Sequence, residues 1–194
     1  MRFSVKDLIN IGIFTVLYVL VIAIFGQLGA LVPITQVLGP LYIPIFAGIP
    51  FMLFLTRVKH FGMVTIMGLL VGLLILATGQ SYWVLVVAIV CAPLADWIMM
   101  TGQYTSWKRS LLGYVVFAIP MIGTVVPLFF AREAFQSKVL ASGHKDQAWV
   151  NTINSLTPMW MFFVMIVMII VGAAIGAYLG RAMLKKHFER AGIA

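Results

Sequence analysis

Catalysis requires acids, bases or nucleophiles that lie together, and this chain of 194 residues has only five acidic residues and three histidines. Asp7, Glu189 and His187 are near the chain ends, while His60, His144 and Asp146 fall in predicted connecting segments. The sequence contains no His-x-x-x-His, no paired carboxylates in an apolar stretch and no Gly-x-Ser-x-Gly, which are patterns typical of hydrolases and proteases. We therefore expect a protein that is not an enzyme and that holds neither a metal ion nor a cofactor.

Asp96 is the one carboxylate inside a long apolar stretch. A charge at the centre of a bilayer costs roughly 2.5–3.5 kcal/mol on insertion scales, so such a residue is a candidate for function. Asp96 lies near the predicted inner end of its helix, within reach of Arg57, Lys59, Lys108 and Arg109. We favour a structural ion pair or an anchor for a helix end over a proton relay.

Aromatic and amide side chains gather at the predicted outer boundary of the membrane. Rings in this position are typical of the aromatic belt that anchors membrane proteins. Amides beside rings also suit a flat small molecule with polar edges, so we expect some of these residues to bind substrate. The predicted substrate-binding residues are Tyr42, Gln80, Tyr82, Trp83, Trp149, Asn151, Asn154 and Trp160.

Two further patterns concern helix packing. Gly172-x-x-x-Gly176-x-x-x-Gly180 and Gly68-x-x-x-Gly72 each place small residues along one helix face, where another backbone can approach closely. For the first pattern we favour packing within this chain over a partner interface. A methionine cluster at 159, 161, 165 and 168 could ligate a soft metal or haem iron, although filling of the core is the commoner use of methionine.

The elements that must position these residues are membrane helices. The chain is 63% hydrophobic and 9% charged, with a mean hydropathy of +1.10, whereas soluble domains carry about 25% charged residues. This composition excludes a soluble or disordered chain, and the length leaves no room for an ATPase domain. The single Cys91 excludes a disulfide framework. We predict an all-α polytopic membrane protein with one transmembrane domain, 1–194, and helices near 8–26, 40–56, 61–78, 82–100, 110–130 and 158–183.

The basic residues orient these six helices. With a cytoplasmic N-terminus, ten of the 13 Lys and Arg residues fall inside: Arg2, Lys6, Arg57, Lys59, Lys108, Arg109, Arg181, Lys185, Lys186 and Arg190. The other three, Arg132, Lys138 and Lys145, fall outside. This asymmetry follows the positive-inside rule and predicts that both termini are cytoplasmic in a multi-pass protein of the cell membrane. The net charge of +8 therefore needs no nucleic-acid partner. An N-terminal signal peptide is the disfavoured alternative, because the apolar run is long and lacks a clean cleavage site.

The outer segments 27–39 and 131–157 are the long ones, which suggests a site that opens outward beneath lid-like loops. Proline residues at 120 and 127 fall within the predicted helix 110–130. Because an internal proline removes a backbone donor, we expect a kink toward the outer half of that helix.

The stretch Val5-Lys-Asp-Leu-Ile-Asn-Ile-Gly-Ile-Phe-Thr15, six short predicted helices, termini on the inside and the lack of an energy domain together suggest a family. The chain resembles the S-components of energy-coupling factor (ECF) transporters, and among them it is most similar to the Trep_Strep group of bacterial membrane proteins. The resemblance implies an S-component-like bundle that binds a vitamin or related micronutrient outside. It also implies partnership with one transmembrane coupling protein and two ATPase subunits, and toppling in the membrane to carry the site inward.

The resemblance also assigns surfaces. S-components carry an Ala-x-x-x-Ala motif on helix one for the coupling protein, and the matching positions here are Gly12 and Val16, of which Val16 departs from the motif. Gly68 and Gly72 would extend that contact face. The ligand would lie beneath 27–39 against the outer ends of helices four to six, near Tyr82, Trp83, Asn151, Asn154 and Trp160.

The favoured function is therefore that of a substrate-binding importer subunit. The alternative is an autonomous secondary carrier or channel for a small solute, for which we would expect an internal repeat or an ionisable relay in the membrane. A less favoured variant is an importer subunit for haem or another tetrapyrrole, and a membrane enzyme lacks a catalytic constellation.

Overall fold

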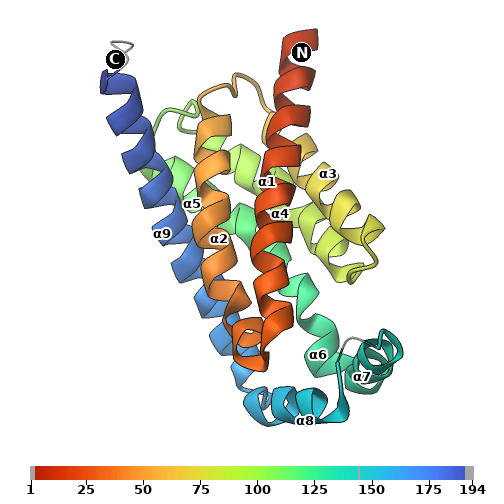
Figure 1. Ribbon diagram of the computed structural model, residues 1–194. Coiled ribbons are helices and arrows are strands. Elements are labelled where there is room, and N and C mark those ends of the chain that lie inside the picture. Colours follow the sequence, from red (N-terminus) through yellow and green to blue (C-terminus); the bar gives the residue numbers. More distant parts are fainter. Residues whose placement is uncertain (1–2, 144, 191–194) are drawn as a thin grey trace.

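The computed structural model describes residues 3–143 and 145–190, and within these ranges the chain is helical and has no strand. Figure 1 shows three long helices running the length of the molecule: α1 (Val5–Leu31), α2 (Pro33–Leu55) and α9 (Met161–Arg190). Between α2 and α9 in sequence lie α3 (Met63–Ala77), α4 (Trp83–Met100), α5 (Trp107–Ala118), the 3-10 helix η1 (Ile119–Thr124), α6 (Val126–Phe130), α7 (Arg132–Ala141) and α8 (Gln147–Leu156). The predicted all-α fold is confirmed.

The two ends of the bundle differ in composition. α1 begins and α9 ends at the same end, where the α2–α3 and α4–α5 connections also lie (Figure 1). We call it the basic end, because Arg57, Lys59, Lys108 and Arg109 lie there. The opposite end, which we call the distal end, carries α7, α8 and the break between α1 and α2 (Figure 1). The charge asymmetry of the sequence thus corresponds to two separate ends of the molecule.

Four helical stretches are long and apolar enough to cross a membrane: Val5–Gly29, Pro33–Leu55, Trp83–Met100 and Met161–Lys185. The apolar helix α3 has only 15 residues, which is about 22 Å of helix against a hydrocarbon core of about 30 Å. The predicted helix 110–130 is divided by η1, which has Pro120 in its first turn. The expected interruption at Pro120 is confirmed, whereas six spans with cytoplasmic termini remain a prediction.

The two long segments predicted as outer loops are largely helical, which corrects their interpretation. In 27–39 only Val32 leaves helical geometry, with φ −139° and ψ 150°. Pro33 explains this break, because proline disfavours the helical conformation of the preceding residue while fitting the first turn of the next helix. In 131–157, α7 and α8 occupy most of the segment, and α8 begins at the N-cap Asp146. The distal end is therefore covered by short helices rather than by loops.

The glycine pattern of α9 packs against α2, as expected for contact within the chain. A Cβ on Gly172 or Gly176 would collide with the backbone carbonyl of Leu41 or Pro44, respectively. On α2, a Cβ on Gly48 would lie 2.5 Å from the backbone of Gly176. The two backbones therefore touch along a glycine seam that larger side chains would separate.

Asp96 anchors the start of α3. Its Oδ2 accepts hydrogen bonds from the backbone N–H groups of Gly62 (2.8 Å) and Thr65 (2.9 Å) and from the Thr65 hydroxyl (2.9 Å). Its Oδ1 accepts a 2.7 Å bond from the Tyr104 hydroxyl. These donors are uncharged, so the helix-end anchor is confirmed and these contacts replace the expected ion pair. A carboxylate at a helix N-terminus also suits the helix dipole.

The α4–α5 turn adopts an unusual backbone at this anchor. Gln103 and Tyr104 have φ of 52° and 57°, a left-handed conformation that non-glycine residues seldom adopt. The bond from Tyr104 to Asp96 holds this turn against the start of α3. Burial, together with the Asp96 carboxylate, raises the pKa of the Tyr104 hydroxyl well above its usual value, so this donor keeps its proton.

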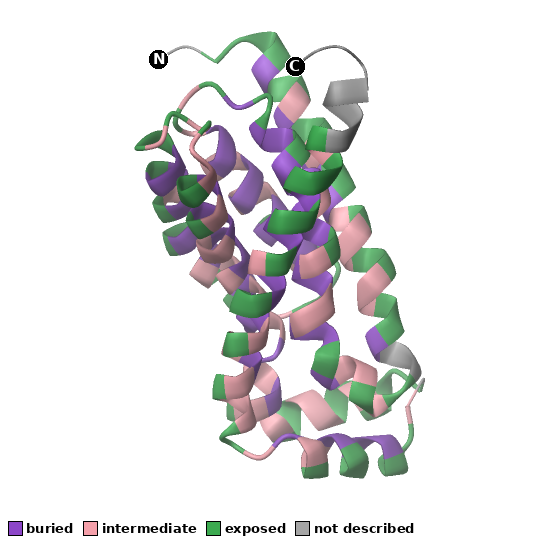
Figure 2. Ribbon diagram, turned by 90° about the vertical axis from the view of Figure 1, so that its left-hand side faces the viewer, coloured by how far each residue is buried: buried purple, intermediate pink, exposed green. Residues whose placement is uncertain are grey.

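Burial follows the bundle axis. Figure 2 shows buried residues facing the interior and exposed residues along the outer faces, with the two alternating along the lowest helix, α8. Trp149, Val150 and Ile153 form the side of α8 that is buried against the core, a pattern typical of an amphipathic helix that covers a helix bundle. Among the four helices long enough to cross the membrane, α1 is the least buried and α2 the most.

Candidate functional site

Most of the predicted substrate-binding residues form two groups in the distal half of the molecule. Gln80, Tyr82 and Trp83 lie in and just after the α3–α4 turn, and all three are exposed. Trp149, Asn151 and Asn154 lie on α8. The two groups come from segments about 70 positions apart in the sequence, and α7 lies between them.

α7 connects the two groups through polar side chains. The Lys138 amine donates a hydrogen bond to the Gly79 carbonyl in the α3–α4 turn. Gln136 donates through Nε2 to Oδ1 of Asn154 on α8, at 3.2 Å. Each link is a single hydrogen bond, and Phe135 and Val139 of α7 also pack against the core. Neither side chain was among the predicted site residues, although the polar composition of 131–157 in so apolar a chain marks the segment.

Arg132 fixes the start of α7. Its guanidinium donates to the carbonyl of Leu128 at the end of α6 (3.2 Å) and to that of Thr157, just after α8 (2.7 Å). These carbonyls belong to helix ends, where a cation is favourable because the last carbonyls lack partners within the helix. α7 is therefore fixed at its first residue by two hydrogen bonds and held by single side-chain hydrogen bonds farther along.

The α3–α4 turn group is built on glycines. Gly79 has φ of 79°, a conformation that glycine adopts without steric cost, and this reverses the chain between α3 and α4. The rings of Tyr82 and Trp83 stack with centroids 5.2 Å apart. A Cβ on Gly123 of η1 would collide with the backbone of Trp83 and Val84. The 3-10 helix thus packs directly against the start of α4 and positions this aromatic pair.

Trp149 is the most distinctive member of the α8 group. Its side chain is 9% exposed, and its indole Nε1 has no hydrogen-bond partner among the described residues. Lys145 places its amine 3.6 Å from the ring centroid, a cation–π contact, and burial lowers the pKa of that amine. A buried donor without a partner costs roughly 1–3 kcal/mol, so an acceptor atom of a ligand at this nitrogen would remove the penalty.

Three of the predicted substrate-binding residues take no part in the link between the two groups. The Tyr42 hydroxyl donates to the carbonyls of Phe25 (3.0 Å) and Thr35 (3.3 Å), so it fastens α2 to α1. Asn151 accepts a bond from Gln147 on its own helix. Trp160, just before α9, is exposed. Tyr42 therefore has a structural role between two helices. Trp160 has the exposed position expected of a residue in the aromatic belt.

The predicted coupling residues occupy different surroundings. Gly12 and Val16 are exposed on α1, and no described atom lies within 4 Å of a Cβ placed on Gly12. Gly68 and Gly72 are instead buried between α3 and α4, where added Cβ atoms would meet Ala92 at 2.5 Å and Leu85 at 3.1 Å. The small size of Gly68 and Gly72 therefore serves packing within the chain, and the free part of the predicted contact face is on α1.

The methionines of α9 also serve packing within the chain. Met165 is completely buried in the core, and Met161 packs against that core. Both positions fit the filling of irregular space between helices, which is a common use of the flexible thioether side chain.

Several long apolar helices define this chain as a multi-pass integral membrane protein. Within that class it belongs to the Trep_Strep family, described as hypothetical bacterial integral membrane proteins, which it matches over residues 5–190. Comparison with curated proteins and with solved structures found no match.

Proposed function

We propose that this chain is the substrate-binding subunit, the S-component, of an ATP-driven ECF-type importer. It would capture a vitamin or related micronutrient at the distal end from outside the cell and deliver it inward with a coupling protein and two ATPase subunits. Membership of a bacterial integral membrane family supports the membrane setting, and the sequence resemblance to S-components supports the transport role.

The observation that carries this proposal is the free surface of α1. Within the described helices, the two glycines with no atom within 4 Å of a placed Cβ are Gly12 and Gly26, and both lie on α1. The other helical glycines contact neighbouring segments of this chain, except Gly39, where an added Cβ would meet only Ile43 and Tyr42 of its own helix. Small residues on an exposed membrane helix allow a second helix to approach closely. The free face of α1 is therefore suited to the coupling protein.

The distal end suits the capture of a small ligand. The Trp149 indole N–H lacks a partner among the described residues, and Asn154 and Gln136 bond to each other across α7 and α8. Amides released from such a bond can read the polar edge of a heterocycle, while the rings of Tyr82 and Trp83 supply flat apolar surfaces. In this proposal α7 opens to admit the ligand and closes over it.

The proposal is tested by purifying the full chain from native membranes in mild detergent and identifying its partners by mass spectrometry. We expect a transmembrane coupling protein and two ATPase subunits to co-purify in constant proportion. Their reproducible absence would contradict the proposal.

Variants of Gly12 test the docking face. Gly12→Leu should abolish both co-purification and uptake, since the side chain would separate the helices, while ligand binding stays intact. Gly12→Ala is the matched control, because it restores the residue of the family motif and should retain both. If Gly12→Leu keeps its partners, the coupling protein does not dock at this face.

A further inference from the structure

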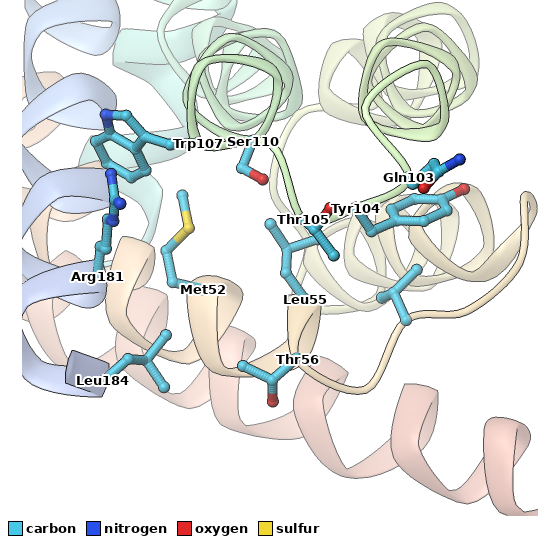
Figure 3. A pocket seen from close by; sticks show the side chains of 11 residues that line it. Met52, Leu55, Thr56, Gln103, Tyr104, Thr105, Trp107, Ser110, Arg181 and Leu184 are labelled. Atoms are coloured by element: carbon cyan, nitrogen blue, oxygen red, sulfur yellow. The ribbon is translucent and has the colours of Figure 1, made fainter. Parts of the chain in front are cut away.

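A cavity lies at the basic end, opposite the proposed substrate site. It has a volume of about 390 Å³ and lies between the end of α2, the α4–α5 turn, the start of α5 and the last turns of α9. Figure 3 shows Trp107 and Arg181 on one side, Ser110 above and Leu55 near its centre. The volume falls in the range of small-molecule sites, and none of the predicted binding residues lines it.

Arg181 and Trp107 form one wall of the cavity. The guanidinium carbon of Arg181 lies 4.5 Å from the Trp107 ring centroid, and Tyr178 contacts the same ring edge-on, with centroids 6.4 Å apart. Stacking on an indole orients a guanidinium but leaves its N–H donors available. Arginine in such a position binds phosphate through two parallel hydrogen bonds.

Ser110 supplies a second donor. It lies one helical turn after Trp107, on the same face of α5, and is only 7% exposed. Figure 3 shows its hydroxyl directed into the cavity. The other hydroxyls in the lining already donate: Thr56 to the Leu53 carbonyl, Thr105 to that of Gly102, and Tyr104 to Asp96. The Ser110 side chain has no such bond with another described residue, so it is available to a ligand.

The rest of the cavity is apolar, and its surroundings are basic. Met52, Leu55 and Leu184 contribute aliphatic lining, while Arg57, Lys108 and Arg109 lie at the same end of the bundle. A ligand that matches both features has an anionic head and an apolar body. The positive-inside rule predicts that this end faces the cytoplasmic leaflet, which carries anionic lipids.

We propose that this cavity binds the phosphate headgroup of an anionic phospholipid, with Arg181 and Ser110 donating hydrogen bonds to the phosphate and the aliphatic lining contacting the glycerol region. The bound lipid would fill the space between α2, α5 and α9 at the basic end. The inference concerns a different site from the proposed substrate site and requires no coupling partner.

The test is native mass spectrometry of the purified full chain, delipidated and then exposed to phosphatidylglycerol or phosphatidylcholine. Wild type should retain phosphatidylglycerol about tenfold more strongly than phosphatidylcholine. Arg181→Gln should lose about tenfold in phosphatidylglycerol retention and Ser110→Ala about threefold, as expected for a charged and a neutral hydrogen bond. Lys108→Gln removes a charge at the same end from a residue outside the lining, and it should change retention less than twofold.

Two controls separate the outcomes. The unfolding temperature of each variant in detergent establishes that it is folded, and Arg181→Lys, which keeps the charge without the planar fork, should retain an intermediate amount of lipid. Equal retention of the two lipids by wild type, or unchanged retention by folded Arg181→Gln, would overturn the proposal. A third arm adds inorganic phosphate alone. If phosphate binds in an Arg181-dependent manner and phosphatidylglycerol does not, the cavity is a site for a small free anion and the lipid assignment is wrong.

Discussion

The basic end and the distal end both use polar side chains to join helices, but they do so with very different strength. At the basic end, Asp96 is completely buried and accepts four hydrogen bonds from three residues, two at the start of α3 and one in the α4–α5 turn. At the distal end, two hydrogen bonds from Arg132 hold the start of α7, and Lys138 and Gln136 add one bond each farther along. Phe135 and Val139 of α7 also pack against the core. Buried, multiply bonded contacts open rarely, whereas single bonds from flexible side chains open easily. We therefore expect the basic end to act as the fixed frame and the distal end to be the part that opens.

The glycine seam supports the same division. The close contact of α9 with α2 through Gly172 and Gly176 ties together the two helices that connect the ends. Motion at the distal end can then occur without separating the long helices. Four predictions test this comparison, and they are ordered by the expected change in stability.

The largest effect is expected from Gly176→Leu. The new side chain would collide with the Pro44 carbonyl, which must force α9 from α2, and overpacking of this kind costs about 3 kcal/mol or more. The readout is the yield of monodisperse protein and the unfolding temperature in detergent. Gly12→Leu introduces the same side chain where no described atom lies within 4 Å, so its unfolding temperature should equal that of wild type. Equal losses in both variants would contradict the seam.

Asp96→Asn should have the next largest effect. Replacing the carboxylate weakens hydrogen bonds to the backbone of Gly62 and Thr65, and hydrogen bonds to a charged group contribute roughly 1.5–3 kcal/mol. Asp146→Asn is the matched change at the distal end, where the carboxylate caps α8 through one 2.8 Å bond from the backbone N–H of Trp149. Asparagine is itself a good N-cap, so this variant should lose less than about 0.5 kcal/mol. Chemical unfolding curves measure both, and a larger loss for Asp146→Asn would reverse the comparison.

Lys138→Ala should have a small effect on stability but a clear effect on motion. An exposed hydrogen bond of this kind contributes about 1 kcal/mol or less. We expect hydrogen–deuterium exchange of α7 to accelerate severalfold, while α3 next to Asp96 exchanges as in wild type. Lys145→Ala, which removes a nearby distal cation without a link to Gly79, serves as the control. If α7 exchange does not change in Lys138→Ala, the bond to Gly79 does not hold α7 closed.

Trp149→Phe should have a similarly small effect on stability. The change removes the indole N–H, which has no partner among the described residues. The gain in stability from removing this unpaired donor offsets part of the loss from the poorer packing of the smaller ring. We expect a change within about 1 kcal/mol in unfolding free energy, together with weaker retention of any co-purified ligand. Retention at the wild-type level would remove the indole N–H from the proposed site.

The sequence could predict helices, their order and the segregation of charge, because these depend on composition and on regular spacing. The seam of Gly172 and Gly176 and the interruption at Pro120 were predictable for the same reason. Rules based on single glycine and proline residues were less successful in predicting where a helix begins. The sequence predicted an outer segment that ends at Gly39 and a helix that begins near Pro40, yet both residues lie inside α2, because a helix packed against neighbours tolerates internal proline.

For the candidate site, the sequence could predict the types of residue present but not their contacts. Aromatic and amide residues near the distal end were visible in the sequence, but their partners were not. The contacts of Lys138 with Gly79 and of Gln136 with Asn154 join residues that are 59 and 18 positions apart in the chain, and no local pattern encodes such pairs. The cavity beside Arg181 and Ser110 likewise arises only when α2, α5 and α9 are assembled.

The most direct test of the proposed division is mass spectrometry of small molecules that co-purify with the wild-type chain, with Asn154→Ala and with Arg181→Gln. The account predicts that wild type and Arg181→Gln carry the same small heterocyclic molecule in near-stoichiometric amount, and that Asn154→Ala loses most of it. Loss of that molecule from folded Arg181→Gln, with full retention by Asn154→Ala, would place the substrate at the basic end and contradict the account.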